Sequence, residues 1–539
     1  MFLRQIISVA TLAAASLVSV AAANAKVFYV AQNASRSNAG GTSCGDALSA
    51  AWFSNSSSWG TASHQISAGT TVYLCGVFKG SPGEELLTVH GSGSAGSPIT
   101  IKFLTGTVLT APYWSGNGAI HMDGVSDIVV DGGTNGVIEN TANGTGRAYH
   151  QNSVAVHAAS CTGCTVQNLT IQNLYVRTAA SDTAPSHSIN CVYWHGSNSL
   201  TINKVTCHDA SWAMAGDGNN FTLANSDIYH VDHGVASGAV GAASNYSIRN
   251  NHFHDFANWD SPGNTYHHDA IHIWGQNGNK VSGGAIYNNT FDGDFGVNVT
   301  AHVYLQDSIS HFAVYNNTFY TPSNRVIHAL WFAAGSTTSL PGGPATGNSA
   351  YNNSINAGGH RSGTALFVES QLLFTAVNNI LAGGQSNITI QGGGTRSTTG
   401  INNNVYRDLF AEFGDTNAFG FAGGNYYTLA KWQAACHCDL ASKLITGAQT
   451  TAFSSVTGPA GSTVAGAAVT SPDAPADAVN LAVVATPTTS DPELALLATV
   501  GQGNGLNLTD IAVDALAPLA LDPNGTARPA SGPWNVGPF

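Results

Sequence analysis

Short segments in which apolar and polar residues alternate recur through the middle of the chain, and they share one six-residue pattern. It reads apolar, any residue, Asn, Asn or apolar, any residue, apolar, as in residues 286–291. Copies are anchored at Asn168, Asn225, Asn250, Asn288, Asn316, Asn352, Asn378 and Asn403, with a degenerate copy at Lys204. Alternation of this kind predicts β-strands with one buried face. Ile286 and Phe291 should therefore point inward, and Tyr287 should point outward.

The spacing of the copies indicates a solenoid. Successive anchors lie between 21 and 38 residues apart, which fits one coil of short strands plus a loop of variable length. Asparagine tolerates the left-handed backbone of a tight corner, and equal positions in stacked coils lie about 4.8 Å apart. We therefore expect the Asn residues to be structural and to form one continuous stack. The predicted fold class is all-β, a parallel β-solenoid of about ten or more coils.

Composition and charge narrow the function. Charged residues make up 9% of the chain, against about 25% in an ordinary soluble protein, which excludes a long coiled coil. The 17 Lys and Arg residues face 30 Asp and Glu residues, a formal net charge of -13. This balance argues against nucleic acid as a partner, because phosphates are bound by cationic side chains. It also disfavours unaided capture of a polyanionic sugar, although a bridging cation would reverse that.

The first 25 residues predict a signal peptide. Arg4 precedes a mostly apolar run that ends in Ala23, Asn24 and Ala25, the small-x-small pattern of a signal-peptidase site. No later stretch approaches the roughly 18 uninterrupted apolar residues of a membrane span. We therefore expect a secreted monomer, extracellular or periplasmic, without a membrane span.

Eight cysteines suit an oxidising compartment. Several lie close together, as in Cys161-x-x-Cys164 and Cys436-x-Cys438. Each of these pairs lacks a second Cys/His pair at the spacing of a zinc site. Local disulfides are therefore favoured over zinc, with their connectivity left open.

Several segments carry a resemblance to a known family. The chain has an apolar strand at 27–30 followed by residues 66–74, then Ile128-Val-Val-Asp131-Gly132, and near its end residues 427–433, 522–529 and 534–537. Together these resemble the opening strand, first coil, early-coil signature and closing segments of the secreted right-handed parallel β-helix proteins of the pectate-lyase-like superfamily. The resemblance implies a right-handed parallel β-helix and an enzyme of the polysaccharide lyase or glycoside hydrolase type. It hardly identifies the substrate, because one fold hosts many functions.

The repeat and the resemblance divide the chain into four parts. Residues 1–25 form the signal peptide, 26–96 an N-terminal cap with the first coil, 97–410 the β-helix with a catalytic groove, and 411–539 a C-terminal closing segment. Within the last part, residues 455–500 are poor in aromatics and rich in Ala, Thr, Ser, Pro and Val. We expect this stretch to be loosely structured and not a separate catalytic domain.

A second regularity is a histidine where four successive coils enter a strand: His233, His272, His302 and His328. We expect these to share one register, with His272 and Trp274, and likewise His302 and Tyr304, on the outward face. Stacked histidines repel when protonated, so they are a poor choice for stability alone. The densest ionisable run of the chain, residues 254–269, flanks them. We therefore place the functional site here.

Three chemistries remain open at this site. Hydrolysis usually needs two carboxyl groups, about 5 Å apart for retention or about 6.5 to 9.5 Å for inversion, which Asp232 and Asp269 on adjacent coils could supply. β-Elimination needs a base at the sugar C5 and a group that neutralises the uronate, roles open to His272, Tyr304, Arg325 and Arg361. Metal catalysis would use Asp269, His272 and His302 as ligands. The predicted reaction requires no cofactor, although a divalent cation such as calcium could take part.

Family signatures decide little among these chemistries. Residues 267–271 resemble the Asn-Thr-Asp-Gly segment of β-helical polygalacturonases only at Asp269, and the other signatures of that family are absent. The usual Lys base of the lyase branches is not evident either, since only Lys204 and Lys280 fall within the central coils.

We therefore predict a secreted enzyme that cleaves a polysaccharide in a groove along the outer face of the coils, with hydrolysis favoured. One alternative is a polysaccharide lyase that acts by β-elimination on a uronate-containing glycan. The other is a non-catalytic glycan-binding or adhesin solenoid. The catalytic candidates are Asp269, His272, Asp232, His268, His302 and Arg325; the substrate-binding candidates are Trp274, Tyr304, His233, His328 and Arg361.

Overall fold

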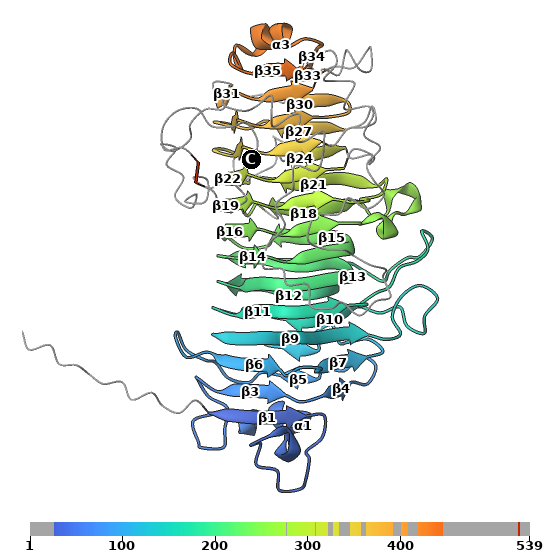
Figure 1. The fold of residues 1–539 in the computed structure, drawn as a ribbon, viewed down its shortest axis with the longest axis vertical. Coiled ribbons are helices and arrows are strands. Elements are labelled where there is room, and N and C mark those ends of the chain that lie inside the picture. Colours follow the sequence, from blue (N-terminus) through green and yellow to red (C-terminus); the bar gives the residue numbers. More distant parts are fainter. Residues whose placement is uncertain are drawn as a thin grey trace, which may run out of the picture.

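The computed structural model describes residues 26–275, 278–307, 309–321, 327–333, 345–356, 363–391, 400–407, 418–445 and 527–528. Their strands stack along the long axis of the molecule, with β1 (Val27–Ala31) near one end and α3 (Leu429–Cys436) at the other (Figure 1). Each strand pairs with the equivalent strand of the next coil, so that three columns of strands run along the stack.

The first column contains β1, β3 (Thr71–Leu74), β6 (Ile99–Phe103), β9 (Ile128–Asn140), β11 (Thr165–Gln172), β13 (Thr201–Asn219), β14 (Thr222–Ala224), β16 (Ala243–Arg249), β19 (Val281–Tyr287), β22 (Ser310–Tyr315), β25 (Ser349–Tyr351), β28 (Thr375–Val377) and β31 (Gly400–Asn402). The second contains β4 (Val77–Lys79), β7 (Val108–Ala111), the continuations of β9, β11 and β13, the start of β15 (Asp227–Ala239), β17 (His252–His254), β20 (Thr290–Asp292), β23 (Thr318–Tyr320), β26 (Ser354–Asn356), β29 (Ile380–Ala382), β32 (Val405–Arg407) and β35 (Lys443–Ile445).

The third column contains β5 (Leu87–Thr88), β8 (Ile120–His121), β10 (Ser153–His157), β12 (Ile189–Asn198), the ends of β13 and β15, β18 (His268–Gly275), β21 (Val299–Gln306), β24 (His328–Phe332), β27 (Thr364–Glu369), β30 (Ser386–Gln391) and β33 (Phe419–Phe421). All pairings within the three columns are parallel. This is the all-β, parallel β-helix that the repeat predicted.

The corner asparagines occupy the register predicted for them. The pairings of the first column place Asn168, Lys204, Asn225, Asn250, Asn288, Asn316, Asn352, Asn378 and Asn403 at one corner of successive coils. All of them have a positive φ, between 49° and 59°. Asparagine is enriched there because it adopts the left-handed conformation more readily than most other side chains. The prediction of one continuous stack is confirmed.

The residue after the corner forms a second ladder, which the pattern did not distinguish from the first. Asn251, Asn289, Asn317, Asn353, Asn379 and Asn404 are buried, and the amide nitrogen of each donates to Oδ1 of the next at 2.9 to 3.1 Å. The same nitrogen also donates to a backbone carbonyl, as from Asn317 to Ile286 at 2.9 Å. The first Asn therefore turns the corner, and the second satisfies polar groups that the coil buries.

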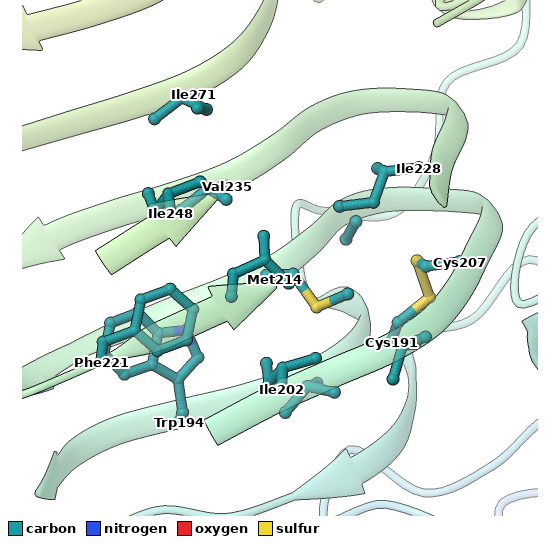
Figure 2. Close-up of a cluster of buried hydrophobic side chains, with 14 of the residues drawn as sticks. Cys191, Trp194, Ile202, Cys207, Met214, Phe221, Ile228, Val235, Ile248 and Ile271 are labelled. Carbon is teal, nitrogen blue, oxygen red and sulfur yellow. A yellow bond between two sulfur atoms is a disulfide. The ribbon is translucent and has the colours of Figure 1, made fainter. Parts of the chain in front are cut away.

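Apolar side chains from all three columns fill the interior. Figure 2 shows Trp194 and Phe221 lying face to face, near Ile202 and Met214. Their ring centroids are 3.9 Å apart. Ile286 and Phe291 are both fully buried, which confirms their inward orientation.

Tyr287 corrects a prediction. It lies on the outer side of the first column, as alternation predicted, but it is only 9% exposed. Its ring stacks on Tyr315 at 4.8 Å, and both belong to a second apolar cluster with Tyr351 and Val377. Arg528 reaches the same corner, where its Nη2 donates to Asn316. This outer face is therefore covered, and Tyr287 is a packed residue.

Short elements close the two ends. At the first end, β2 (Leu48–Ser49) pairs with β1 beside α1 (Ala50–Phe53), and 3-10 turns lie at Cys44–Asp46 and Ser56–Ser58. At the other end, β34 (Gly424–Tyr426) pairs antiparallel to β33, and α3 buries Trp432, whose indole donates to Asp439. Two further 3-10 turns, Ala257–Trp259 and Pro262–Asn264, belong to the insertion before β18.

The eight cysteines form four disulfides: Cys44–Cys75, Cys161–Cys164, Cys191–Cys207 and Cys436–Cys438. The predicted local disulfides are confirmed, and no thiol remains for zinc. Disulfides are typical of extracytoplasmic proteins. Among the described residues, no helix has the length and apolar character of a membrane span. The predicted signal peptide and the 455–500 stretch lie outside the described residues, and the domain boundaries stay predictions.

Candidate functional site

The strand entering the third column breaks its alternation at the predicted site. In β18 both Ala270 and Ile271 belong to the apolar core, and the pairing of β18 with β21 shifts register between His268 and Asp269. Two adjacent inward residues place Asp269 and His272 on the same outer side of the coil. Strict alternation would have put them on opposite faces.

The predicted histidine register is wrong. His233 aligns with Asp269, then with Ala301 and His328, whereas His272 aligns with Ala236, Tyr304 and Trp331. The reason is that loops of different length enter the third column, so similar letters in successive coils do not share a position. Of the predicted row, His233 and His272 lie instead around one carboxylate, that of Asp269.

Three imidazoles surround Asp269, which is fully buried. Its Oδ2 lies 3.3 Å from Nε2 of His233, 3.6 Å from Nε2 of His267 and 3.6 Å from Nδ1 of His272. Its Oδ1 accepts a hydrogen bond from the Ala301 backbone nitrogen at 2.8 Å. We call His233, His267, Asp269 and His272 the histidine–aspartate cluster.

Further contacts orient the cluster from behind. Nδ1 of His233 lies 3.0 Å from Asp232, which is fully buried. Asp232 also contacts Nδ1 of His268 at 3.2 Å, and Nε2 of His268 lies 2.9 Å from Asp260. On the other side, Nε2 of His272 lies 3.0 Å from Oε1 of Gln306.

Protonation at the cluster follows from burial and from these neighbours. Burial alone would raise the pKa of Asp232 and Asp269, but adjacent imidazoles hold both pKa values below the usual range. Burial would lower the pKa of His233, yet its two carboxylate neighbours raise it to about 10. Burial lowers the pKa of His272 to about 4. Both carboxyl groups are therefore ionised at neutral pH.

A buried arginine holds the neighbouring insertions together. The Arg177 guanidinium donates to the backbone carbonyls of Asn258, Asp260 and Ala180 at 2.7 to 2.8 Å. It also lies over the ring of Tyr266 at 5.1 Å. This ties the loop before β12 to the insertion before β18, which carries His267.

The loop before β12 contributes His187, which sequence reasoning missed. Its exposed imidazole stacks on Trp212 with centroids 4.5 Å apart, and its Nδ1 lies 3.7 Å from Asp232. Burial lowers its pKa, so the imidazole is neutral at neutral pH. His187 precedes Asp269 by many residues, and no pattern in the sequence linked the two.

Half-buried aromatic rings continue from the cluster along the third column. Tyr304 stacks between His272 and Trp331, with centroids 4.5 and 4.4 Å apart. Trp274 lies over His272 at 4.4 Å and meets Trp212 edge-on at 5.9 Å. Trp212 lies in β13, and β13, β15, β18, β21 and β24 are successive layers of one face in Figure 1.

Two other predicted site residues, His302 and His328, lie apart from the cluster. His302 is fully buried: its ring packs edge-on against Phe295 at 4.6 Å, and its Nε2 contacts Thr321. It occupies the additional inward position at the break in alternation, so its predicted outward orientation is wrong. His328 stacks on Phe367 at 4.1 Å. Arg325 and Arg361 lie outside the described residues.

Comparisons with known proteins concern the fold. No family model matches the chain, and no curated protein matches it. Among solved structures, the pectate lyase Pel9A is 14% identical, with 66% of this chain and 79% of that one covered and a TM-score of 0.39. The PL6 family polysaccharide lyase Pedsa3628 from Pseudopedobacter saltans is 12% identical, with coverage of 68% and 89% and a TM-score of 0.32. The Dettilon tailspike protein is 11% identical, with coverage of 65% and 62% and a TM-score of 0.29.

Proposed function

We propose that the protein is a carbohydrate-active enzyme that cleaves a uronate-containing polysaccharide by β-elimination on the outer face of the third column. The observation that carries this proposal is that imidazoles are exposed at the site while the carboxyl groups are buried. Imidazoles of His187 and His267 are half exposed, with 45% and 43% of their side chains accessible, whereas Asp232 and Asp269 are fully buried behind them. The reacting groups offered to a substrate are therefore imidazoles and not carboxyl groups.

The same observation argues against hydrolysis by Asp232 and Asp269. A glycosidase needs one carboxyl group to donate a proton to the leaving oxygen and another to attack or to activate water. Asp232 and Asp269 are ionised and occupied by histidines, and neither reaches solvent. The acidic pair favoured from sequence is thus used to position imidazoles.

Elimination asks for a base, a proton donor and a cationic centre. A base removes the proton from C5 of the uronate, the electron pair forms the double bond between C4 and C5, and the bond from C4 to the glycosidic oxygen breaks. The leaving oxygen then takes a proton from water, and the base returns the proton that it took from C5 to the solvent. We assign the base to His187, which is neutral and half exposed, and we place the uronate carboxylate against the histidine–aspartate cluster.

The aromatic row supplies a platform for the sugar chain. Trp212, Trp274, Tyr304 and Trp331 are each half buried, with part of the side chain open to solvent. Sugar rings have apolar faces that stack on such side chains, whose large flat surface contributes binding energy. A chain lying along this row would pass directly over His272, which is stacked on Tyr304.

A panel of polysaccharides tests the proposal. Uronate-containing polymers such as polygalacturonate and alginate are compared with neutral polymers, and products are followed by reducing ends and by the ultraviolet absorbance of unsaturated uronates. We expect both signals with at least one uronate polymer. Reducing ends without absorbance would mean hydrolysis, and binding without either signal would mean a glycan-binding solenoid.

Two substitutions make the panel specific to the site. His187→Gln should lower turnover by about a hundredfold or more, the usual cost of losing a general base. His195→Gln is the matched control, because His195 is similarly exposed, at 48%, and pairs with Asp217 away from the cluster. Equal activity in the two variants would contradict the assignment of the base.

A further inference from the structure

We propose that His233, His267, Asp269 and His272 bind a transition-metal ion of the zinc type. One ligand atom from each of the four residues lies within 4.8 Å of the other three. The metal site is inferred from this geometry alone, and only its role in catalysis rests on the proposed function.

The separations around Asp269 are those of ligands that share an ion. Bonds of about 2.0 to 2.1 Å in a tetrahedral zinc site place neighbouring ligand atoms about 3.3 to 3.5 Å apart. The three imidazole nitrogens lie 3.3, 3.6 and 3.6 Å from Asp269 Oδ2. Ordinary N–H···O hydrogen bonds are shorter, about 2.7 to 3.2 Å. Oδ2 is buried and has no hydrogen-bond partner among the described residues.

The outward contacts of the ligands point their free atoms into the cluster. Nε2 of His272 faces the Gln306 carbonyl oxygen, so this nitrogen carries the proton and Nδ1 presents a lone pair. That lone pair faces Oδ2 of Asp269, a second acceptor 3.6 Å away, and a cation between the two atoms would stabilise this arrangement. His233 is held through Nδ1 by Asp232, which is the carboxylate–histidine arrangement found behind metal ligands. Asp269 itself is held through Oδ1.

The two other histidine–aspartate clusters within the described part of the chain have a different geometry. Nδ1 of His157 lies 2.6 Å from Asp123, and Asp227 lies 3.2 Å from Nδ1 of His252 and 3.1 Å from Nε2 of His254. These are close, direct hydrogen bonds that satisfy the carboxylates without an ion. Single long pairs also occur, as between His150 and Asp182 at 3.8 Å. What distinguishes Asp269 is that three imidazole nitrogens converge on its Oδ2 at 3.3 to 3.6 Å.

The donor set selects the class of metal. Three imidazoles and one carboxylate suit zinc and its first-row neighbours, whereas calcium takes six to eight oxygen ligands. Calcium, the cation considered from sequence, therefore does not fit, and His302 is replaced as a ligand by His233 and His267. Because His267 is half exposed, the ion would have one side near solvent, where a uronate carboxylate could approach it.

Metal analysis of the mature full-length protein tests the site. The protein should be purified without a histidine tag and without chelators, and its metal content measured by mass spectrometry. We expect about one zinc-type ion per chain. After a chelator has removed the bound ion, cobalt(II) should occupy the site and give the visible absorption of a tetrahedral complex. Added calcium should not displace the cobalt.

Variants separate a specific site from chance binding. His267→Gln should lower the affinity for zinc by at least a hundredfold while leaving the fold intact, because His267 lies at the surface. Gln306→Ala should lower it by about 10- to 100-fold, the usual effect of removing a partner behind a ligand. His195→Gln is the control and should bind like the unaltered protein.

The possible outcomes test the metal site and the proposed reaction separately. Folded protein with no ion and no cobalt band, or a His267→Gln variant that binds like the control, would mean a protonated histidine cluster instead. Cleavage of polysaccharide by the metal-free protein would keep the proposed function while removing the ion from it. A bound ion without cleavage of any uronate polymer would leave the site standing and refute the proposed reaction.

Discussion

Replacing Asn317 should reveal how much the buried asparagine ladder contributes to stability. Asn317 Oδ1 accepts from both the backbone nitrogen and the side-chain amide of Asn289, each at 3.0 Å. In Asn317→Ala both donors stay buried without this partner. Each such group costs about 1 to 3 kcal/mol, so we expect a loss of about 2 to 6 kcal/mol in the free energy of unfolding. Asn317→Asp keeps the acceptor but loses the donors to Asn353 and Ile286, and it buries a charge, so it should be no milder.

The neighbouring corner position supplies the comparison. Asn288 has a φ of 54°, a conformation that glycine adopts freely. Asn288→Gly should therefore change stability by less than about 1 kcal/mol, although it removes the same side chain. The assay is urea unfolding followed by circular dichroism. Similar midpoints for Asn317→Ala and Asn288→Gly would refute the division of roles between the two asparagines of the repeat.

Three other predictions follow from described contacts. Tyr287→Ala should cost about 3 kcal/mol or more, comparable to Ile286→Ala, because Tyr287 is packed; a negligible shift in melting temperature would mean that its outer face is open. Hydrogen bonding to Asp123 raises the pKa of His121 to about 9, so its contribution to stability should be full below about pH 6.5 and be lost as the pH rises through about 9. The difference in unfolding free energy between His121→Gln and the unaltered protein should shrink over that range, and a constant difference would contradict the assignment. Trp331→Ala should raise KM for the polysaccharide by about two- to tenfold with kcat unchanged, as measured by initial rates; an unchanged KM would remove the aromatic row from substrate binding.

The architecture was predictable because one physical signal recurs in every coil. Alternation identified the strands, and the corner asparagines set the register of the first column, as at Asn288 and Asn316. A left-handed corner and a buried face are local requirements, so they leave a mark in each short stretch of sequence. The different role of the second Asn was not visible, because both asparagines satisfy the same pattern of letters.

Outward orientation proved a weaker guide to exposure than inward orientation is to burial. Tyr287 and His272 both point away from the interior, yet 9% of each is exposed. One is covered by the tyrosine cluster and the other lies between Trp274 and Tyr304. Alternation describes a single strand against the core, whereas what covers the outer side comes from neighbouring coils and distant segments, which no local pattern records.

The candidate site could be predicted only in part, for a related reason. Asp269, His272 and His233 were all candidates from the sequence, and the structure brings them together, but their mutual geometry depends on a register shift between β18 and β21 and on insertions of unequal length. His187 lies in a loop that Arg177 joins to the insertion before β18 through backbone carbonyls. The repeat specifies the strand positions that successive coils share, whereas the candidate site is formed by insertions and register shifts that differ from coil to coil. The parts of this chain that break its own pattern are therefore where its chemistry should be sought.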